Sequence, residues 1–508
     1  MAATVGSALN WWARTKGETT ALRVGDDELT YGELQHWSSR LARHLADTGI
    51  NPGDRVGVLS PNVIEWPVIA LAVIKAGAVL VPFNARLKPA EIRKVADDAG
   101  LSMLFAGPTQ LAAATEASAG GTEFGVLGFD AAEALRGGEP DDFRIDTAAD
   151  DPIAIVFTSG STGLSKGVIL TNATLLGIVL ERTLTEEGFR PGAVSLLVLP
   201  LAFTPGLVYG VLITTVLGGT LIVEPELKAS RAVSLIEKYG VQTLFGVPVI
   251  FESLSRAPEF ETADLTSLQS AIIGGAAVPV ELLRRWADKG VLLRQIYGMT
   301  EAGGVATATL KSEALEHPDS CGPGSIFTEV RVMNEDGTLA APGEPGELVV
   351  RGPGVTPGYW NDPATTAAAF RNGWLHSGDI GRSDEQGRIT FADRLKDLII
   401  SGGINISPVE LEQTIATLDG VAEVAVIPAL DDRWGETPAA IITPAAGHES
   451  LDQSAIIAHC EKLLSDYKVP RYVVLRPDPL PRMPSGKLDK RAIREEYQDL
   501  PERFSKAR

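Results

Sequence analysis

Residues 157–168 read Phe-Thr-Ser-Gly-Ser-Thr-Gly-Leu-Ser-Lys-Gly-Val. Glycines, hydroxyl residues and one lysine in this order predict a loop whose backbone N–H groups can surround phosphate oxygens. The segment is not a Walker phosphate loop, because Ser165 stands where that motif needs glycine and Gly167 stands where it needs serine or threonine. The segment therefore predicts a nucleotide site of a different kind.

The residues on either side of this loop indicate its place in the fold. The apolar run Ile153–Phe157 precedes the loop, and Val168–Leu170 follow it before a helix cap at Thr171 or Asn172. We therefore expect the loop to lie between two strands, whereas the loop of a P-loop NTPase runs from a strand directly into a helix.

Further apolar runs and amphipathic segments alternate in the first half of the chain. Four runs are expected to be buried strands: Arg55–Leu59, Ala78–Pro82, Ala154–Phe157 and Ser195–Leu199. Between such runs lie segments with helical periodicity, for instance Tyr31–Thr48. This alternation predicts an α/β fold with parallel sheets, whose binding crevices lie at the carboxyl ends of the strands.

The pattern changes in the second half of the chain. Gly346–Arg351 and Arg388–Phe391 lie among turns and predict a small antiparallel β unit. A compact α+β module is expected after Leu395, and its elements are a strand near Leu398–Ser401, a helix near Pro408–Thr417, a strand at Val421–Pro428 and a helix near Gln453–Asp466. We place the boundary at Arg394–Lys396, which gives domains 1–395 and 396–508 joined by a short hinge.

Length and composition restrict the class of protein. A chain of 508 residues is expected to form at least two domains, and 44% hydrophobic with 22% charged residues is typical of a globular protein. The most apolar stretch, Val63–Phe83, contains Glu65 and Lys75, so no membrane span is expected. Residues 1–10 lack the pattern of a signal peptide.

Charge and cysteine content narrow the class further. A formal charge of −20 argues against nonspecific binding to nucleic acid or anionic lipid. The stretch from Glu461 onward is nevertheless basic, with 12 Lys or Arg against 8 Asp or Glu, and is either a solvated surface or a site for an anionic partner. The two cysteines, Cys321 and Cys460, lie far apart in the sequence and match no metal-ligand spacing. They do not predict a disulfide framework, so we expect a reducing, cytoplasmic location.

At this point the chain resembles the adenylate-forming superfamily, which includes acyl-CoA synthetases, firefly luciferases and nonribosomal-peptide adenylation domains. The resemblance runs from Leu29-Thr30-Tyr31 to Lys487, with the motifs in the family's order. It implies a large N-terminal domain and a small mobile C-terminal domain. It also implies that ATP activates a carboxylic acid as an acyl-adenylate and that the acyl group then passes to coenzyme A.

The family's nucleotide motifs fall on two main segments of this chain. In Tyr297-Gly298-Met299-Thr300-Glu301 the resemblance implies that the ring stacks on adenine, Thr300 contacts the α-phosphate and Glu301 holds Mg²⁺, which prefers hard oxygen ligands. Asp379, in Trp374–Asp379, and Arg394 match residues that reach the ribose. The full set of ATP- or AMP-binding residues implied by the resemblance is Thr158, Ser159, Gly160, Ser161, Thr162, Gly163, Lys166, Gly275, Ala276, Tyr297, Gly298, Met299, Thr300, Asp379 and Arg394.

The C-terminal motifs imply two half-reactions. Lys487, in Pro481–Lys487, resembles the lysine that enters during adenylation, where a cation can neutralise charge on the phosphorus oxygens. Thr300, Glu301 and Lys487 are the catalytic residues that the resemblance implies, and Lys396 occupies the hinge position. After rotation of the small domain, Ser401, Gly402 and Gly403 would line the pantetheine tunnel, since glycine lets the thiol arm pass close to backbone. Lys468 or Arg471 is a candidate for the CoA phosphates.

The acyl segment departs from the family pattern. Many relatives read Pro-Leu-Phe-His where this chain reads Pro200-Leu201-Ala202-Phe203, so that Phe203 is either a wall of the acyl pocket or the sign of a weakened adenylation step. The expected pocket residues are Phe203, Thr204, Pro205, Leu207, Phe245, Val247, Ala276, Gly298, Met299, Gly303 and Gly304. None carries a charge, which predicts a neutral acyl tail. The small residues predict room for a medium or long, aromatic or bulky alicyclic acid.

Several alternatives stay open at the level of sequence. The enzyme could load a separate carrier protein in place of CoA, or it could be impaired in adenylation and thioesterify a supplied acyl-adenylate. A luciferase-like oxygenase is a further catalytic alternative. The chain could also be a non-catalytic nucleotide-binding protein. Mg²⁺ is the expected cofactor, ATP and CoA are the expected co-substrates, and the protein could be a monomer or a homodimer.

Overall fold

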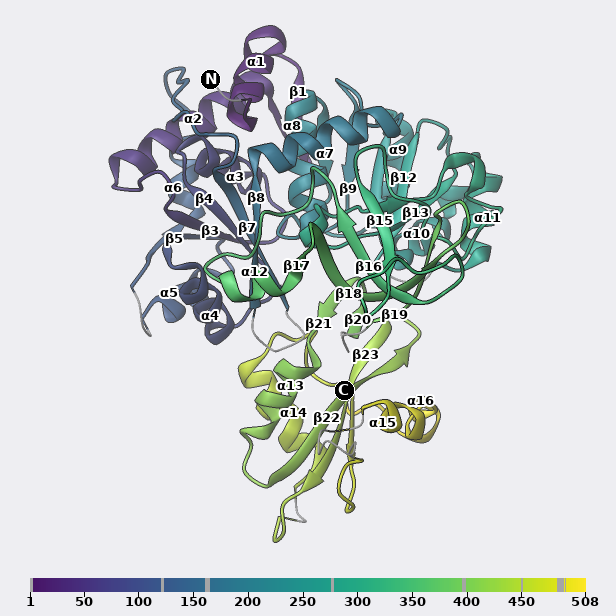
Figure 1. Ribbon diagram of the computed structural model, residues 1–508. Helices are drawn as coiled ribbons and strands as arrows, with labels where there is room; N and C mark the ends of the chain where they lie inside the picture. Colours follow the sequence, from purple (N-terminus) through teal and green to yellow (C-terminus); the bar gives the residue numbers. More distant parts are fainter. Residues whose placement is uncertain are drawn as a thin grey trace. The chain divides into compact units, whose positions relative to one another are not determined.

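The structure is a computed structural model of the chain, shown in Figure 1. It describes residues 3–119, 123–159, 165–275, 278–394, 399–448, 451–481, 488 and 490–508. The chain forms two compact units, of which the first comprises 1–85, 93–157 and 167–393 and the second comprises 86–92, 158–166 and 394–508. The expected hinge residue Lys396 lies outside the described residues, so the hinge remains a prediction.

A six-stranded sheet is formed by the described residues of the first half of the chain, in the order β6-β5-β3-β4-β7-β8. Its strands are β3 (Arg55–Leu59), β4 (Val79–Phe83), β5 (Leu101–Ala106), β6 (Gly125–Gly128), β7 (Pro152–Ser159) and β8 (Ser165–Thr171). Strand β3 pairs in parallel with both β4 and β5. All five residues of β4 are buried, which explains why a central parallel strand reads as a continuous apolar run.

An eight-stranded sheet runs through the described residues in the order β14-β13-β12-β11-β9-β10-β1-β2. Its strands are β1 (Thr20–Val24), β2 (Asp27–Thr30), β9 (Val194–Leu197), β10 (Thr220–Val223), β11 (Thr243–Gly246), β12 (Ser270–Gly274), β13 (Leu293–Tyr297) and β14 (Thr307–Ala308). Side chains alternate between its faces, since Ala271 and Ile273 belong to one core and Ile272 to the other. Helices α9 (Ala229–Tyr239), α10 (Pro248–Ser255) and α11 (Val280–Asp288) contribute to the first of these cores (Figure 1).

The helices begin at side-chain caps that the sequence indicates. Helix α2 (Tyr31–Asp47) begins after a capping box between Thr30 and Glu33, and α7 (Asn172–Thr185) begins after Thr171. Both confirm the predicted starts. The other helices before β13 are α1 (Val5–Lys16), α3 (Glu65–Lys75), α4 (Pro89–Ala99), α5 (Leu111–Ser118), α6 (Phe129–Glu133), α8 (Ile213–Leu217), the π-helix η1 (Pro205–Leu212) and the 3₁₀ turn η2 (Pro258–Glu261).

A smaller antiparallel sheet follows, as the sequence predicts. Among the described residues it has five strands, namely β15 (Glu329–Met333), β16 (Gly346–Arg351), β17 (Phe370–Arg371), β18 (Trp374–Ser383) and β19 (Ile389–Arg394). Strand β16 pairs with β15 on one side and with β18 on the other. The short elements nearby are η3 (Thr300–Ala302), η4 (Lys311–Glu313) and α12 (Pro363–Ala369).

The second unit is an α+β module built on a long antiparallel hairpin. Its strands are β20 (Ile399–Ser401), β21 (Ile404–Ile406), β22 (Val421–Asp431), β23 (Gly435–Pro444) and β24 (Tyr472–Leu475). Val424 and Val426 face a core with α13 (Pro408–Ala416) and α14 (Gln453–Leu463), whereas Ala425 and Ile427 face α15 (Lys490–Glu496) and α16 (Leu500–Arg503) (Figure 1).

These elements confirm the predicted fold class, an α/β N-terminal region followed by an antiparallel β unit and an α+β module. The described part of the chain contains no helix that is both long enough and apolar enough to cross a membrane.

The core beside the eight-stranded sheet generates a prediction about stability. Trp286 is fully buried, donates through its indole N–H to the Phe251 carbonyl at 3.1 Å, and lies edge-on to Phe251 and Phe260. We expect Trp286→Ala to lower the free energy of unfolding by about 3–5 kcal/mol, because a large cavity forms. Urea unfolding followed by circular dichroism measures this loss. The control is Trp11→Ala at a half-exposed position, and a comparable loss in both variants would contradict the prediction.

Candidate functional site

The turn after strand β13 carries several of the predicted site residues. β13 ends at Tyr297, and Gly298 and Met299 lead into the 3₁₀ turn that begins at Thr300. The Tyr297 side chain is buried, and its ring stacks against Phe391 with the ring centroids 6.1 Å apart. This turn leaves the carboxyl end of a parallel strand, the position where α/β sheets place their ligands.

Asp379 on strand β18 lies next to this turn. The Tyr297 hydroxyl donates to the Asp379 carboxylate at 2.9 Å, and Asp379 is buried. Gly378 has a φ of +72°, a conformation that glycine adopts without strain. The backbone N–H of Gly378 donates to Glu347 Oε1 at 2.9 Å, so that Glu347 holds the turn that carries Asp379.

Glu301 is buried and has a tyrosine as its partner. The Tyr359 hydroxyl donates to Glu301 Oε1 at 2.9 Å. Burial raises the pKa of Tyr359, and the nearby Glu301 charge raises it further, so the phenol keeps its proton and donates. The bond occupies one oxygen of a carboxylate that has about four lone-pair sites.

Glu301 fits a magnesium ion that arrives with ATP. Among the described residues, no group of three or more His, Cys, Asp or Glu side chains could form a metal cage. Mg²⁺ does not need such a cage, because it keeps several waters and is usually held by one or two carboxylates and the phosphates of its substrate.

One hydrogen bond joins the predicted acyl segment to the predicted nucleotide segment. The hydroxyls of Thr204 and Thr300 are 2.9 Å apart, and either one can donate. Thr204 directly precedes the π-helix η1, which begins at Pro205. A π-helix often marks a functional site, and here it places the acyl segment at the turn after β13.

An aromatic wall lies along the π-helix. Tyr209 is buried and its ring is tilted against Phe245, with centroids 5.1 Å apart, and edge-on to Phe189 at 6.2 Å. Behind these rings is a cavity of about 10 Å³, room for about one water molecule, lined also by Ser195 and Thr243. Thr243 donates to Ser195 at 2.7 Å, so the hydroxyls beside this cavity satisfy each other.

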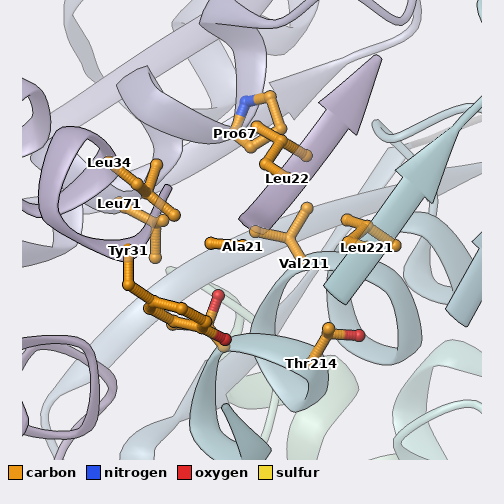
Figure 2. Close-up of a pocket in the computed structure, with 10 residues that line it drawn as sticks. Ala21, Leu22, Tyr31, Leu34, Pro67, Leu71, Val211, Thr214 and Leu221 are labelled. Atoms are coloured by element: carbon orange, nitrogen blue, oxygen red, sulfur yellow. The ribbon is translucent and has the colours of Figure 1, made fainter. Parts of the chain in front are cut away.

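A second cavity of about 10 Å³ lies elsewhere in the same unit, and Figure 2 shows the side chains around it. The labelled side chains are apolar apart from Tyr31 and Thr214, and the Tyr31 hydroxyl donates to the Gly219 carbonyl at 2.7 Å. The cavity is too small for a substrate, so we treat it as part of the core.

Three of the predicted small pocket residues are glycines that pack closely against other parts of the protein. A Cβ at Gly298 would lie 2.0 Å from the Gly304 carbonyl oxygen, and a Cβ at Gly303 would lie 2.6 Å from Ile178. A Cβ at Gly304 would lie 2.8 Å from the Tyr209 ring. Glycine therefore permits close packing of the protein against itself at these positions, and their role in the acyl pocket remains a prediction.

The remaining predicted acyl-pocket residues belong to elements around the same strand ends. Phe203 is partly exposed, Leu207 is buried within the π-helix, and Val247 follows strand β11. Gly275, at the end of β12, has a φ of +79° and lies beside Val247. The structure does not describe Ala276, so its predicted role in both the acyl and nucleotide sites is untested.

The phosphate loop is described only at its two ends, and these confirm that it lies between two strands. It leaves β7 at Ser159 and enters β8 at Ser165, and the Thr158 hydroxyl donates to the Lys166 carbonyl at 3.5 Å. Gly160, Ser161, Thr162 and Gly163 lie outside the described residues, as does Lys487. For Ser159 and Arg394 only the backbone is described.

The predicted CoA-binding residues lie in the second unit. Ser401 is buried, and Gly402 and Gly403 have positive φ angles in the turn between β20 and β21. Gly402 also packs against the Trp434 ring, because a Cβ there would lie 2.7 Å from it.

The two candidate CoA cations differ in their surroundings. Lys468 is buried and its ammonium lies 2.9 Å from the Glu410 carboxylate, so a phosphate would compete with that carboxylate. Arg471 is less buried, and its backbone accepts a hydrogen bond from Ala507 at 2.7 Å. Binding of CoA by either residue remains a prediction.

Sequence reasoning missed three residues that shape the site. They are Glu347, Tyr359 and Tyr209, which contact Gly378, Glu301 and Phe245 respectively. Their contacts join distant parts of the chain, and the only signal at Tyr359 is the turn sequence Pro357-Gly358-Tyr359.

The predicted nucleotide residues and the predicted acyl segment thus meet at the end of a parallel strand, an arrangement compatible with an adenylate-forming enzyme. Residues 9–360 match the family model of the AMP-binding enzymes, and residues 410–487 match that of the AMP-binding enzyme C-terminal domain. The chain belongs to this AMP-binding enzyme family.

Relatives that cover nearly the whole chain narrow the class. The chain is 37% identical to a feruloyl-CoA synthase of an Amycolatopsis species, over 96% of this chain and 97% of that protein. It is 36% identical to a long-chain-fatty-acid–CoA ligase of Mycobacterium tuberculosis, over 93% and 94% respectively. The structure of o-succinylbenzoate CoA synthetase from Bacillus subtilis matches with a TM-score of 0.87 at 27% identity, over 96% of this chain and 98% of that one. The chain is an ATP-dependent acyl-CoA ligase, an AMP-forming acid–thiol ligase.

The packing at Gly298 generates a second prediction. We expect Gly298→Ala to lower kcat/KM by more than about tenfold for every accepted acid, because the new methyl would displace the turn that carries Thr300 and Glu301. Steady-state kinetics with a short and a long acid measure the effect. Gly137→Ala is the control, since nothing lies within 4 Å of a Cβ there. A loss confined to the longer acid would show that Gly298 faces open acyl space and would contradict the prediction.

Proposed function

We propose that this ligase activates a hydrophobic acid with an aromatic or alicyclic ring and transfers it to CoA. The observation that carries the proposal is the pair of 2.9 Å hydrogen bonds, Thr204 to Thr300 and Tyr297 to Asp379, which bring an acyl segment and a nucleotide segment to one strand end. Residues that bind the two reactants are thereby in reach of the same reacting atoms.

The first half-reaction joins the acid to AMP. A carboxylate oxygen of the acid attacks the α-phosphorus of ATP, the bond between the α-phosphorus and the bridging oxygen breaks, and pyrophosphate leaves. The Thr300 hydroxyl orients the α-phosphate, and Asp379 accepts hydrogen bonds from the ribose hydroxyls. Lys487 neutralises charge that develops on the phosphorus oxygens. Glu301 would hold the magnesium ion, which would supply positive charge to the phosphate oxygens.

The second half-reaction releases AMP. The CoA thiol loses its proton and attacks the acyl carbon, and the bond between that carbon and the AMP oxygen breaks. Lys396 is the proposed hinge for the change between the two half-reactions, and Ser401, Gly402 and Gly403 are the proposed lining of the thiol path. Arg394 is the second residue proposed to contact the ribose.

The acid class follows from the aromatic wall and from the relatives. A ring can stack offset or edge-on against Tyr209 and Phe245, and such pairs contribute about 0.5–1.5 kcal/mol beyond their buried area. The Tyr209 ring of this wall also lies beside Gly304. The proposed acyl pocket is therefore shallower than the small residues alone predict. Two of the three relatives described above are named for aryl acids, and the third is named for long-chain fatty acids.

Phe203 is proposed as a wall of the acyl pocket. Phenylalanine cannot donate a hydrogen bond to the reacting carboxylate, so Thr300 and Lys487 are left to orient it. A cytoplasmic location remains part of the proposal.

The test is a panel of acids with ATP, Mg²⁺ and CoA, followed by mass spectrometry of AMP and acyl-CoA. We expect kcat/KM for ferulate or indoleacetate to exceed that for palmitate by at least about tenfold, because the aromatic wall limits depth. Preference for palmitate would contradict the proposed acid class.

Two variants separate the steps in the same assay. Lys487→Ala is expected to abolish formation of AMP from ATP while keeping thioester formation from a supplied acyl-adenylate. Tyr209→Ala is expected to raise kcat/KM for palmitate relative to the ring acids. Unchanged relative rates in Tyr209→Ala would remove Tyr209 from the acyl pocket.

A further inference from the structure

Residues 356–360, here called the clamp segment, lie along the strand that follows the phosphate loop. The backbone N–H of Trp360 donates to the Gly167 carbonyl at 2.7 Å, and the backbone N–H of Ile169 donates to the Gly358 carbonyl at 3.3 Å. These bonds flank an antiparallel bridge formed by Tyr359. The clamp segment is thereby fixed to strand β8 directly beyond the loop.

The same clamp segment holds Glu301 at two points. The Tyr359 hydroxyl donates to the Glu301 carboxylate at 2.9 Å, and the Thr356 N–H donates to the Glu301 backbone carbonyl at 2.8 Å. The Thr356 hydroxyl donates to the Ile169 carbonyl at 2.7 Å and lies 2.9 Å from the Gly358 carbonyl. One short segment therefore contacts both Glu301 and the strand after the phosphate loop.

The two contacts of the clamp segment with Glu301 can restrict the position of its carboxylate. Such a restriction favours binding of a metal ion that is also bound by the phosphates of ATP. A glutamate has several rotatable bonds, and ordering them at the moment of binding costs conformational entropy. The Tyr359 bond orders the side chain before the ligand arrives and occupies Oε1. Partners that orient a ligating carboxylate in this way contribute to metal affinity without touching the metal.

We propose that Tyr359 is a positioning residue for the magnesium-binding carboxylate, and that the clamp segment keeps Glu301 in register with strand β8. The inference rests on the proposed role of Glu301 as the magnesium ligand. It adds a specific expectation, which is that loss of the Tyr359 hydroxyl weakens the response to Mg²⁺ more than it affects turnover.

The test compares Tyr359→Phe with Tyr31→Phe in the full chain. Both changes remove a buried hydroxyl that donates one hydrogen bond, but Tyr31 donates to the Gly219 carbonyl beside the small cavity of Figure 2. We expect Tyr359→Phe to raise the Mg²⁺ concentration for half-maximal activity by about tenfold, with kcat near wild type at saturating Mg²⁺. Tyr31→Phe should leave the Mg²⁺ dependence unchanged.

A second readout does not depend on activity. Thermal unfolding is measured with ATP and excess Mg²⁺, and again with ATP and a chelator. In the wild type and in Tyr31→Phe, Mg²⁺ should add to the stabilisation by ATP, because a ligand that binds the folded state raises its melting temperature. In Tyr359→Phe most of this Mg²⁺-dependent increase should disappear.

The variant Glu301→Gln distinguishes failure of the proposed role of Glu301 from failure of the inference about Tyr359. An unchanged Mg²⁺ response in Glu301→Gln overturns the proposed role of Glu301 itself. If the Mg²⁺ response changes in Glu301→Gln but stays normal in Tyr359→Phe, only the inference about Tyr359 is overturned. A change in Tyr31→Phe as large as that in Tyr359→Phe also overturns this inference. Should Tyr359→Phe fail to fold, Thr356→Val loosens the same clamp segment, and a normal Mg²⁺ response there overturns the inference.

Discussion

The backbone of Gly298 packs directly against the Gly304 carbonyl, and a Cβ at Gly298 would lie 2.0 Å from that oxygen. This contact folds the chain back on itself immediately after β13. As a result, Tyr297, Thr300 and Glu301 lie close together at the strand end, within one short turn. The rest of the site depends on this turn, because its side chains are the ones that meet the other segments.

Three distant segments join the turn through hydroxyl hydrogen bonds of the same length. Asp379 accepts from Tyr297, Thr204 shares a hydrogen bond with Thr300, and Tyr359 donates to Glu301, each at 2.9 Å. A neutral hydrogen bond contributes about 1 kcal/mol net, and one to a charged group about 1.5–3 kcal/mol. These bonds therefore contribute more to the geometry of the site than to the total stability of the chain.

Much of the fold could be predicted because its signals are local. Strand β3 has the predicted bounds, and the capping box at Thr30 and Glu33 marks the start of α2. The flanks of the phosphate loop also indicate correctly that it lies between two strands. In each of these cases residues a few positions apart carry the whole signal.

The site could be predicted only in part. Family motifs indicate Thr300, Glu301 and Asp379, but Tyr359 is 58 positions from Glu301 and no local pattern reports that contact. Gly304 shows a second limit of local patterns. A glycine is compatible either with open space or with close approach of other atoms, and the sequence alone does not report the packing of Gly304 against the Tyr209 ring.

In the proposed function, the acyl and nucleotide groups meet at the turn after β13. A crystal structure with a non-hydrolysable feruloyl-adenylate analogue tests this arrangement. We expect the ribose hydroxyls within hydrogen-bond distance of Asp379, the acyl phosphate beside Thr300 and the ring against Tyr209 and Phe245. An analogue whose ribose lies away from Asp379, or whose ring lies away from Tyr209 and Phe245, would contradict the proposed arrangement.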